Sequence, residues 1–64
     1  MTPATMADLK DGTKVLHLEW LTGGTIHVTG SDVEVRWEDT SGDWQVSPEG
    51  PVFPSDLVIV GEAP

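Results

Sequence analysis

Residues 32–38, Asp-Val-Glu-Val-Arg-Trp-Glu, alternate strictly between apolar and charged side chains. Successive side chains of a β-strand point to opposite faces, so the alternation predicts a strand with one apolar face and one wet face. Val33, Val35 and Trp37 are expected to face inward. This stretch is the clearest strand signal in the chain, and the case for an all-β domain starts from it.

A second strand is predicted over residues 25–29, immediately before the dipeptide Gly30-Ser31. A two-residue turn with glycine first is the type II′ choice for a tight hairpin. Because the side-chain period is two, this turn fixes which residues oppose each other across the hairpin. The expected apolar pairs are Val28 with Val33 and Ile26 with Val35.

A first strand is predicted over residues 13–20, with one face inward (Leu16, Leu18, Trp20) and the other outward (Val15, His17, Glu19). The inward residues have even numbers on both the first and the second strand, so the loop between these strands must contain an odd number of residues. Residues 21–23 form such a loop. That register pairs Leu18 with Ile26 and Leu16 with Val28. The predicted core is therefore Leu16, Leu18, Ile26, Val28, Val33, Val35 and Trp37.

The rest of the chain is predicted to form shorter elements. Residues 39–42 resemble a type I turn closed by a left-handed glycine, and residues 44–47 form a fourth strand in which the inward residue, Trp44 or Val46, is left open. Residues 52–53 extend that edge, residues 54–56 suit one helical turn, and residues 57–60 form the last strand. Before them, Thr5 and Asp8 have capping-box spacing. We expect a flexible N-terminal arm over residues 1–10, a barrel over 11–60 and a tail over 61–64.

Composition limits the function classes. The chain has 64 residues, a net charge of −8, only three basic residues and no cysteine. Without cysteine there are no disulfides, thiolate zinc sites or cysteine nucleophiles. Direct nucleic-acid binding is disfavoured because phosphate neutralisation needs lysine and arginine, and anionic membranes are disfavoured likewise. We expect a cytoplasmic protein without a cofactor, a monomer or weak homodimer, and a protein partner with a basic surface.

Four segments together resemble small bacterial barrels. They are Gly-Thr-Lys-Val at 12–15, Gly-Thr-Ile at 24–26 after Trp20, Val-Glu-Val-Arg-Trp-Glu-Asp at 33–39, and Phe-Pro-Ser-Asp-Leu-Val-Ile-Val at 53–60. The order is similar to Tudor-like and KOW-like SH3 barrels, among them the C-terminal Tudor-like domains of repair helicases and short uncharacterised actinobacterial proteins. The resemblance implies a small five-stranded, partly open SH3-like barrel used as an adaptor, in the helicases for docking on RNA polymerase. The chain departs from it in its long 42–52 segment and its acidic charge.

Three groups of residues are candidate sites. The expected register places His17, His27 and Glu34 in one cross-strand row, a set that could hold a divalent metal or act simply as a polar ladder. Carboxylates crowd residues 32–43, where short hairpin loops offer no cleft for a paired-carboxylate hydrolase and a solvated acidic edge is the simpler account.

The third candidate is a partner surface, which we place at Trp44, Phe53, Asp39 and Asp43, since tryptophan is enriched at interface hot spots. The alternative is that Trp44 covers one open end of the barrel. An aromatic cage for methylated lysine would need several convergent exposed aromatics, and we expect only Trp44 and Phe53 to be exposed.

The sequence contains no arrangement of nucleophile and base and no phosphate-binding loop, so we expect no enzyme. We expect instead a protein-interaction adaptor. The alternatives are an acidic mimic that occupies a nucleic-acid-binding site, as small phage proteins do, and a KOW-like nucleic-acid-associated domain.

Overall fold

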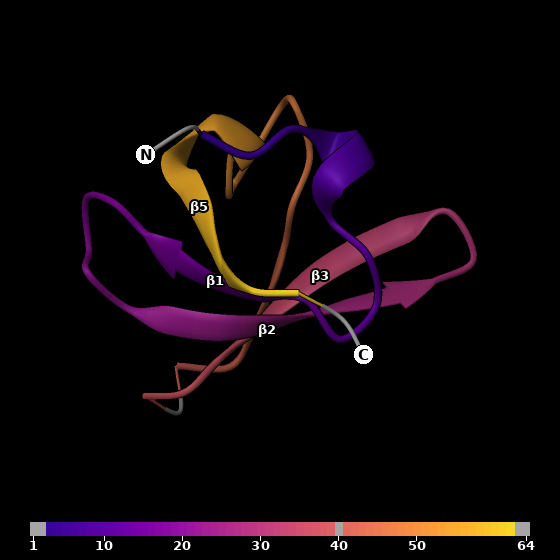
Figure 1. Ribbon diagram of the computed structural model, residues 1–64. Helices are drawn as coiled ribbons and strands as arrows, with labels where there is room; N and C mark the ends of the chain where they lie inside the picture. The colour runs from indigo at the N-terminus through magenta and orange to yellow at the C-terminus, as the bar shows by residue number, and fades with distance from the viewer. Residues whose placement is uncertain (1–2, 40, 63–64) are drawn as a thin grey trace.

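The computed structural model describes residues 3–39 and 41–62. Five antiparallel strands form one strongly curved sheet in the order β4-β3-β2-β1-β5 (Figure 1). The strands are β1 (Lys14–His17), β2 (Gly23–Thr29), β3 (Asp32–Trp37), β4 (Asp43–Gln45) and β5 (Leu57–Gly61), with 3₁₀ turns η1 (Met6–Asp8) and η2 (Pro54–Asp56). The sheet does not close, because its order ends on β4 and β5 as separate edges. The predicted small, partly open SH3-like barrel is confirmed.

The β2–β3 hairpin has the predicted register. Ile26 lies opposite Val35 and Val28 opposite Val33. Gly30 has a φ of 61°, the left-handed conformation that the first position of the turn requires and that glycine adopts without steric cost. Ile26 and Val35 are fully buried, whereas Val28 and Val33 are partly buried against the core. This hairpin is the central part of the sheet.

Strand β1 has the opposite parity from the one predicted. Val15 and His17 are buried, Leu16 is half-buried and Leu18 is exposed, so the expectation that Leu16 and Leu18 are core residues is wrong. The strand ends at His17, and residues 18–22 form a loop of five residues instead of three. The loop closes where the His17 amide donates to the carbonyl of Thr22 at 2.9 Å.

The changed register also changes what faces the first strand. Val15 pairs with Gly24 and Leu16 with Gly23, so the predicted pairs of Leu18 with Ile26 and Leu16 with Val28 do not form. On its other side β1 pairs with β5, where His17 lies opposite Leu57. The core is completed by residues outside the predicted set, which are Ala4, Leu9, Val15, Val46, Val52 and Leu57.

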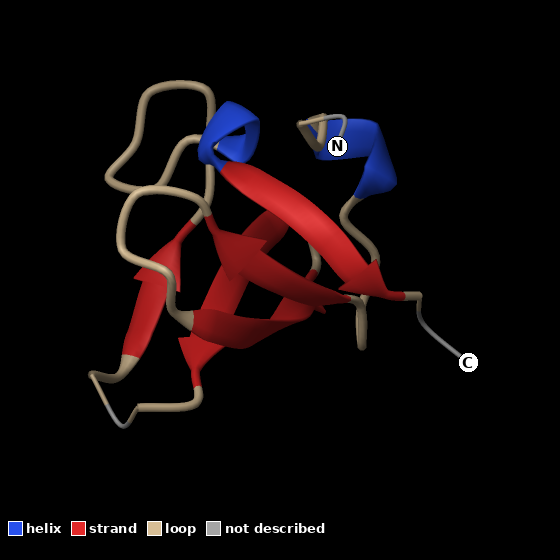
Figure 2. Ribbon diagram, turned by 60° about the vertical axis from the view of Figure 1, so that its left-hand side comes forward, coloured by secondary structure: helices blue, strands red, loops and turns tan. Residues whose placement is uncertain are grey.

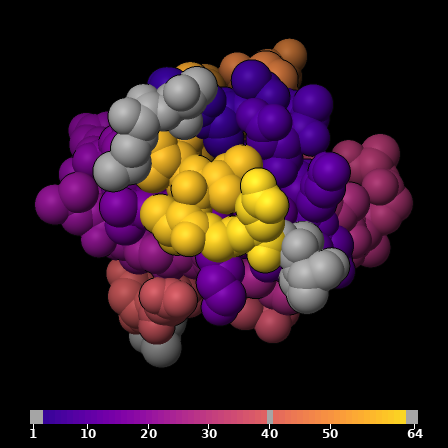
Figure 3. Space-filling model, viewed as in Figure 1, coloured from indigo at the N-terminus to yellow at the C-terminus, as the bar shows by residue number. Residues whose placement is uncertain are grey.

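The N-terminal segment packs on the barrel. Ala4 and Leu9 are buried, and the Ala4 amide donates to the carbonyl of Leu57 at 2.8 Å. Figure 3 shows this segment and β5 side by side on one face of the molecule. The Thr5 amide donates to the Asp8 carboxylate, one half of the predicted capping box, at the start of η1. The interpretation of residues 1–10 as a loose arm did not include these contacts.

The fourth strand is short and is followed by an irregular connection (Figure 2). Trp44 lies opposite the buried Val35, so both face the inner side of the sheet, and Val46 is fully buried. Val46 forms an isolated parallel bridge with Val52, and η2 then leads into β5 as predicted. The question of Trp44 or Val46 is thereby resolved: Val46 is core, and Trp44 is partly covered at the rim.

No helix in the described residues is long and apolar enough to cross a membrane.

Candidate functional site

Two loops meet at one end of the barrel. The β1–β2 loop and the β3–β4 loop lie at the same end because the strands that carry them are antiparallel neighbours. The Glu38 amide donates to the carbonyl of Gly23 at 2.9 Å and joins the two loops. Side chains that end β3, begin β4 and occupy the β1–β2 loop therefore converge there.

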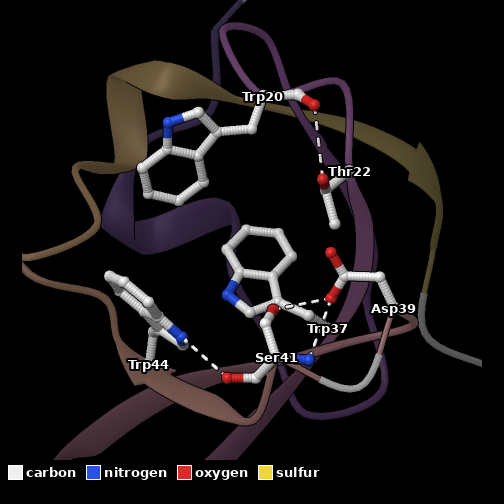
Figure 4. A pocket seen from close by; sticks show the side chains of 6 residues that line it. All are labelled: Trp20, Thr22, Trp37, Asp39, Ser41 and Trp44. Carbon is white, nitrogen blue, oxygen red and sulfur yellow. Dashed lines mark hydrogen bonds between the residues drawn. The ribbon is translucent and has the colours of Figure 1, made fainter.

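Three tryptophans converge at this end around a cavity of about 210 Å³ (Figure 4). The rings of Trp20 and Trp37 form an edge-to-face pair with a centroid distance of 5.9 Å and an interplanar angle of 71°. The rings of Trp20 and Trp44 form a second such pair, at 5.6 Å and 62°. Trp37 is buried, whereas Trp20 is 46% and Trp44 37% exposed. Thr22, Asp39 and Ser41 complete the lining. We call these six residues the tryptophan pocket.

Hydrogen bonds fix the polar side of the tryptophan pocket. The Ser41 hydroxyl donates to Asp39 Oδ1 at 2.6 Å and the Ser41 amide to the same oxygen at 3.0 Å. The bond from the hydroxyl, and to a smaller extent the bond from the amide, hold the pKa of Asp39 below its usual range. The Ser41 carbonyl in turn accepts from Trp44 Nε1 at 3.2 Å. One serine thus orients both an ionised carboxylate and a tryptophan ring.

An exposed apolar edge, made of Leu18 and Leu21, lies in the β1–β2 loop, which also carries the pocket residues Trp20 and Thr22. Leu21 is 75% exposed and has a φ of 54°, in the left-handed region that disfavours residues with a Cβ. Leu18 in the same loop is also exposed. A leucine that is mostly exposed and in a strained backbone conformation contributes little packing to the domain, and such outliers cluster at binding sites.

The predicted partner residues are divided by the structure. Trp44 and Asp39 lie together in the tryptophan pocket. Asp43 points elsewhere and accepts from Arg36 Nε at 3.1 Å, a solvent-exposed pair. Phe53 is exposed, but its ring lies over Gly50 and does not line the cavity.

Sequence reasoning missed Trp20 and Trp37 as pocket residues. The sequence predicted Trp20 on the inner face of the first strand and Trp37 in the core. Trp37 is a core residue as predicted, but Trp20 is exposed, so the expectation that Trp44 and Phe53 are the only exposed aromatics is wrong. The signal that could have found them is position: Trp20 ends the first predicted strand and Trp37 lies one residue before the end of the third, at the same end of the barrel.

The proposed metal row does not form. His17 is buried, because β1 has the other parity, and lies on the inner side away from His27. His27 is opposite Glu34 as predicted, and its Nδ1 lies 3.9 Å from Asp11 Oδ1. Within residues 3–39 and 41–62 no three potential ligands come together in a way that could hold a metal ion. His17, His27 and Glu34 are therefore not a shared site.

Comparisons with protein-family models, curated proteins and solved structures return no match to this chain.

Proposed function

We propose that this chain is a non-catalytic interaction module that docks on a larger protein by taking a cationic side chain into the tryptophan pocket. The observation that carries the proposal is the convergence of three tryptophan rings on one open cavity with an ionised carboxylate at its rim. An arginine or lysine side chain, with or without methyl groups, has the matching chemistry.

The physical argument starts from the indole ring. Its face is electron-rich, and a cation over it gains about 0.5–1 kcal/mol at an exposed site and about 2 kcal/mol when desolvated. The rings of Trp20 and Trp44 touch edge to face, at 62° with their centroids 5.6 Å apart, so a group seated beside that contact in the cavity can reach more than one ring. Asp39 adds a formal charge of the opposite sign, and the net charge of −8 attracts basic partners over a longer range.

The apolar edge favours a protein as the partner. A small cation would fill only the cavity and leave Leu18 and Leu21 in water, whereas a polypeptide that inserts a basic side chain would also cover these leucines. Burying such apolar area contributes about 25 cal/mol per Å². The Tudor-like or KOW-like relationship suggested by the sequence is part of this proposal, and it favours an adaptor.

The direct test is a titration with choline and with its uncharged isostere 3,3-dimethylbutan-1-ol. The three indole N–H signals are followed by ¹H–¹⁵N NMR. We expect choline, but not the alcohol, to shift the signals of Trp20, Trp37 and Trp44. Each ring contributes only about 0.5–2 kcal/mol, so the dissociation constant should be millimolar or weaker. N-acetylarginine amide is the matching peptide-like probe.

The control uses a second exposed aromatic outside the cavity. Trp44→Ala should abolish the response to choline, whereas Phe53→Ala should preserve it because Phe53 does not line the tryptophan pocket. Equal binding of choline and the alcohol would contradict a cation site, and loss of binding in both variants would contradict the placement.

A second candidate rests on the exposed carboxylates of β3, the β3–β4 loop and the start of β4, which are Asp32, Glu34, Glu38, Asp39 and Asp43. An acidic mimic of nucleic acid would use this surface as a whole. Its affinity for a basic target should fall steeply with added salt and survive Trp44→Ala. A KOW-like nucleic-acid binder would instead give a gel shift at low salt, which we do not expect at a net charge of −8.

A further inference from the structure

One buried polar side chain contacts residues of the tryptophan pocket without lining the cavity. His17 is 2% exposed at the end of β1. Its imidazole stacks on the ring of Trp20 with a centroid distance of 3.8 Å and an interplanar angle of 6°. It also meets Trp37 edge-on at 6.0 Å. His17 therefore contacts two of the three tryptophans without lining the cavity itself.

The imidazole also binds the backbone of the loop that carries Trp20. His17 Nδ1 accepts hydrogen bonds from the amides of Glu19 and Trp20, each at 3.2 Å. A nitrogen that accepts carries no proton, so the neutral ring has its proton on Nε2. One side chain thus holds Trp20 twice, through its amide and through its indole face.

The backbone of His17 closes the same loop. Its carbonyl accepts from the Leu21 amide at 2.8 Å, and its amide donates to the Thr22 carbonyl at 2.9 Å. These bonds are independent of the side chain, so a substitution at position 17 can remove the Nδ1 contacts and leave the loop closed. Position 17 therefore separates the closure of the loop from the placement of Trp20.

We infer that His17 is a positioning residue that fixes Trp20 as a wall of the tryptophan pocket through its unprotonated Nδ1. A buried position that served packing alone would be met by an aliphatic or phenyl side chain, since a buried polar atom is costly unless it is hydrogen-bonded. Here the groups that satisfy the imidazole include the amide of the pocket tryptophan itself. The effect on ligand affinity rests on the proposed function, whereas the effect on Trp20 does not.

The test uses two substitutions that divide the properties of the imidazole. His17→Asn places an acceptor oxygen at the position of Nδ1 without the aromatic ring, and His17→Phe keeps a flat ring without an acceptor. Hydrogen exchange of the Trp20 amide is measured by NMR, with the amide of Val35 as the control for global opening. The tautomer of His17 in the unaltered protein is read from long-range ¹H–¹⁵N correlations, which needs no variant.

We expect Nδ1 to be unprotonated. Loss of one hydrogen bond should speed Trp20 exchange about fivefold in His17→Phe relative to Val35, with restoration in His17→Asn. Choline should bind more weakly to His17→Phe than to the unaltered protein, and His17→Asn should restore binding. A protonated Nδ1, or unchanged Trp20 exchange in His17→Phe, would overturn the inference. If choline does not bind the unaltered protein, the proposed function fails while tautomer and exchange still decide the role of His17.

Discussion

Replacing Gly24 with alanine should destabilise the barrel and disturb the tryptophan pocket together. Gly24 is buried in β2 between Val15 and Trp37, its partners on the two neighbouring strands. A Cβ built there would lie 2.6 Å from Val35 Cγ2, 2.9 Å from the carbonyl oxygen of Arg36 and 3.0 Å from Trp37 Cε3. One of these atoms belongs to the backbone of β3 and cannot turn away.

The magnitude follows from two opposing effects. Overpacking a core by one methyl group costs about 1–3 kcal/mol, and replacing glycine by alanine gains about 0.4–1 kcal/mol by restricting the unfolded chain. A net loss of about 1–2 kcal/mol is expected. In a domain of this size each kcal/mol lowers the melting temperature by about 4–8 °C, so the melting temperature should fall by about 5–15 °C. The loss is a large part of a total stability of roughly 3–10 kcal/mol.

Gly23 provides the matched control, since it is the preceding residue of the same strand. Its added Cβ would lie 2.9 Å from Glu38 Oε2, the end of an exposed flexible side chain that can move. Gly23→Ala should therefore be neutral or stabilise by up to about 1 kcal/mol. Urea denaturation followed by tryptophan fluorescence measures both variants. If Gly24→Ala were as stable as Gly23→Ala, the close packing of β2 on β3 inferred here would be wrong.

Three further outcomes are expected. The pKa of Asp39 is lowered in the folded protein, so the contribution of its carboxylate to the free energy of unfolding is complete above the unfolded-state pKa of 3.8 and is lost as the pH falls through the lower folded-state pKa. Ser41→Ala removes the hydroxyl that donates to Asp39 and should raise this pKa, as carboxyl ¹³C NMR would show. Leu57→Ala should cost about 2–5 kcal/mol in chemical denaturation, because Leu57 is fully buried in the core. Leu21→Gly should stabilise by about 1 kcal/mol by relieving the left-handed backbone, yet weaken partner binding measured by calorimetry.

The part of the fold that could be predicted is the part where local signals agree. In residues 25–38 the turn chemistry of Gly30, the apolar alternation and the pairing of Ile26 with Val35 all indicate one register. A one-residue slip would turn every apolar side chain of β3 to water, so no competing register has comparable free energy. The short η2 turn after Phe53 was predictable for a similar reason, since proline at its first position is already in a helical conformation.

Strand β1 could not be predicted because both of its faces carry apolar residues. Treating histidine as a polar, outward residue made Leu16 and Leu18 the inner face. The structure reverses this, because the backbone amides of the following loop satisfy the buried imidazole of His17. The loop that carries those amides turns at Leu21, which has a left-handed backbone conformation. Glycine or asparagine is the usual sequence signal for such a turn, and neither stands at this position.

The tryptophan pocket depends on this same unpredicted turn. With the three-residue loop expected from the sequence, Trp20 would continue β1 on its inner face, as Trp37 does on β3, and both would fill the barrel. The five-residue loop removes Trp20 from the strand and stacks it on His17, and its ring also contacts Trp37 and Trp44 edge to face beside the cavity. Partial exposure of two tryptophans is costly for a core of this size, since apolar area left in water contributes nothing to stability. A ligand that covers these rings would recover part of that free energy, so the proposed binding would depend on the same unusual β1–β2 loop that exposes Trp20.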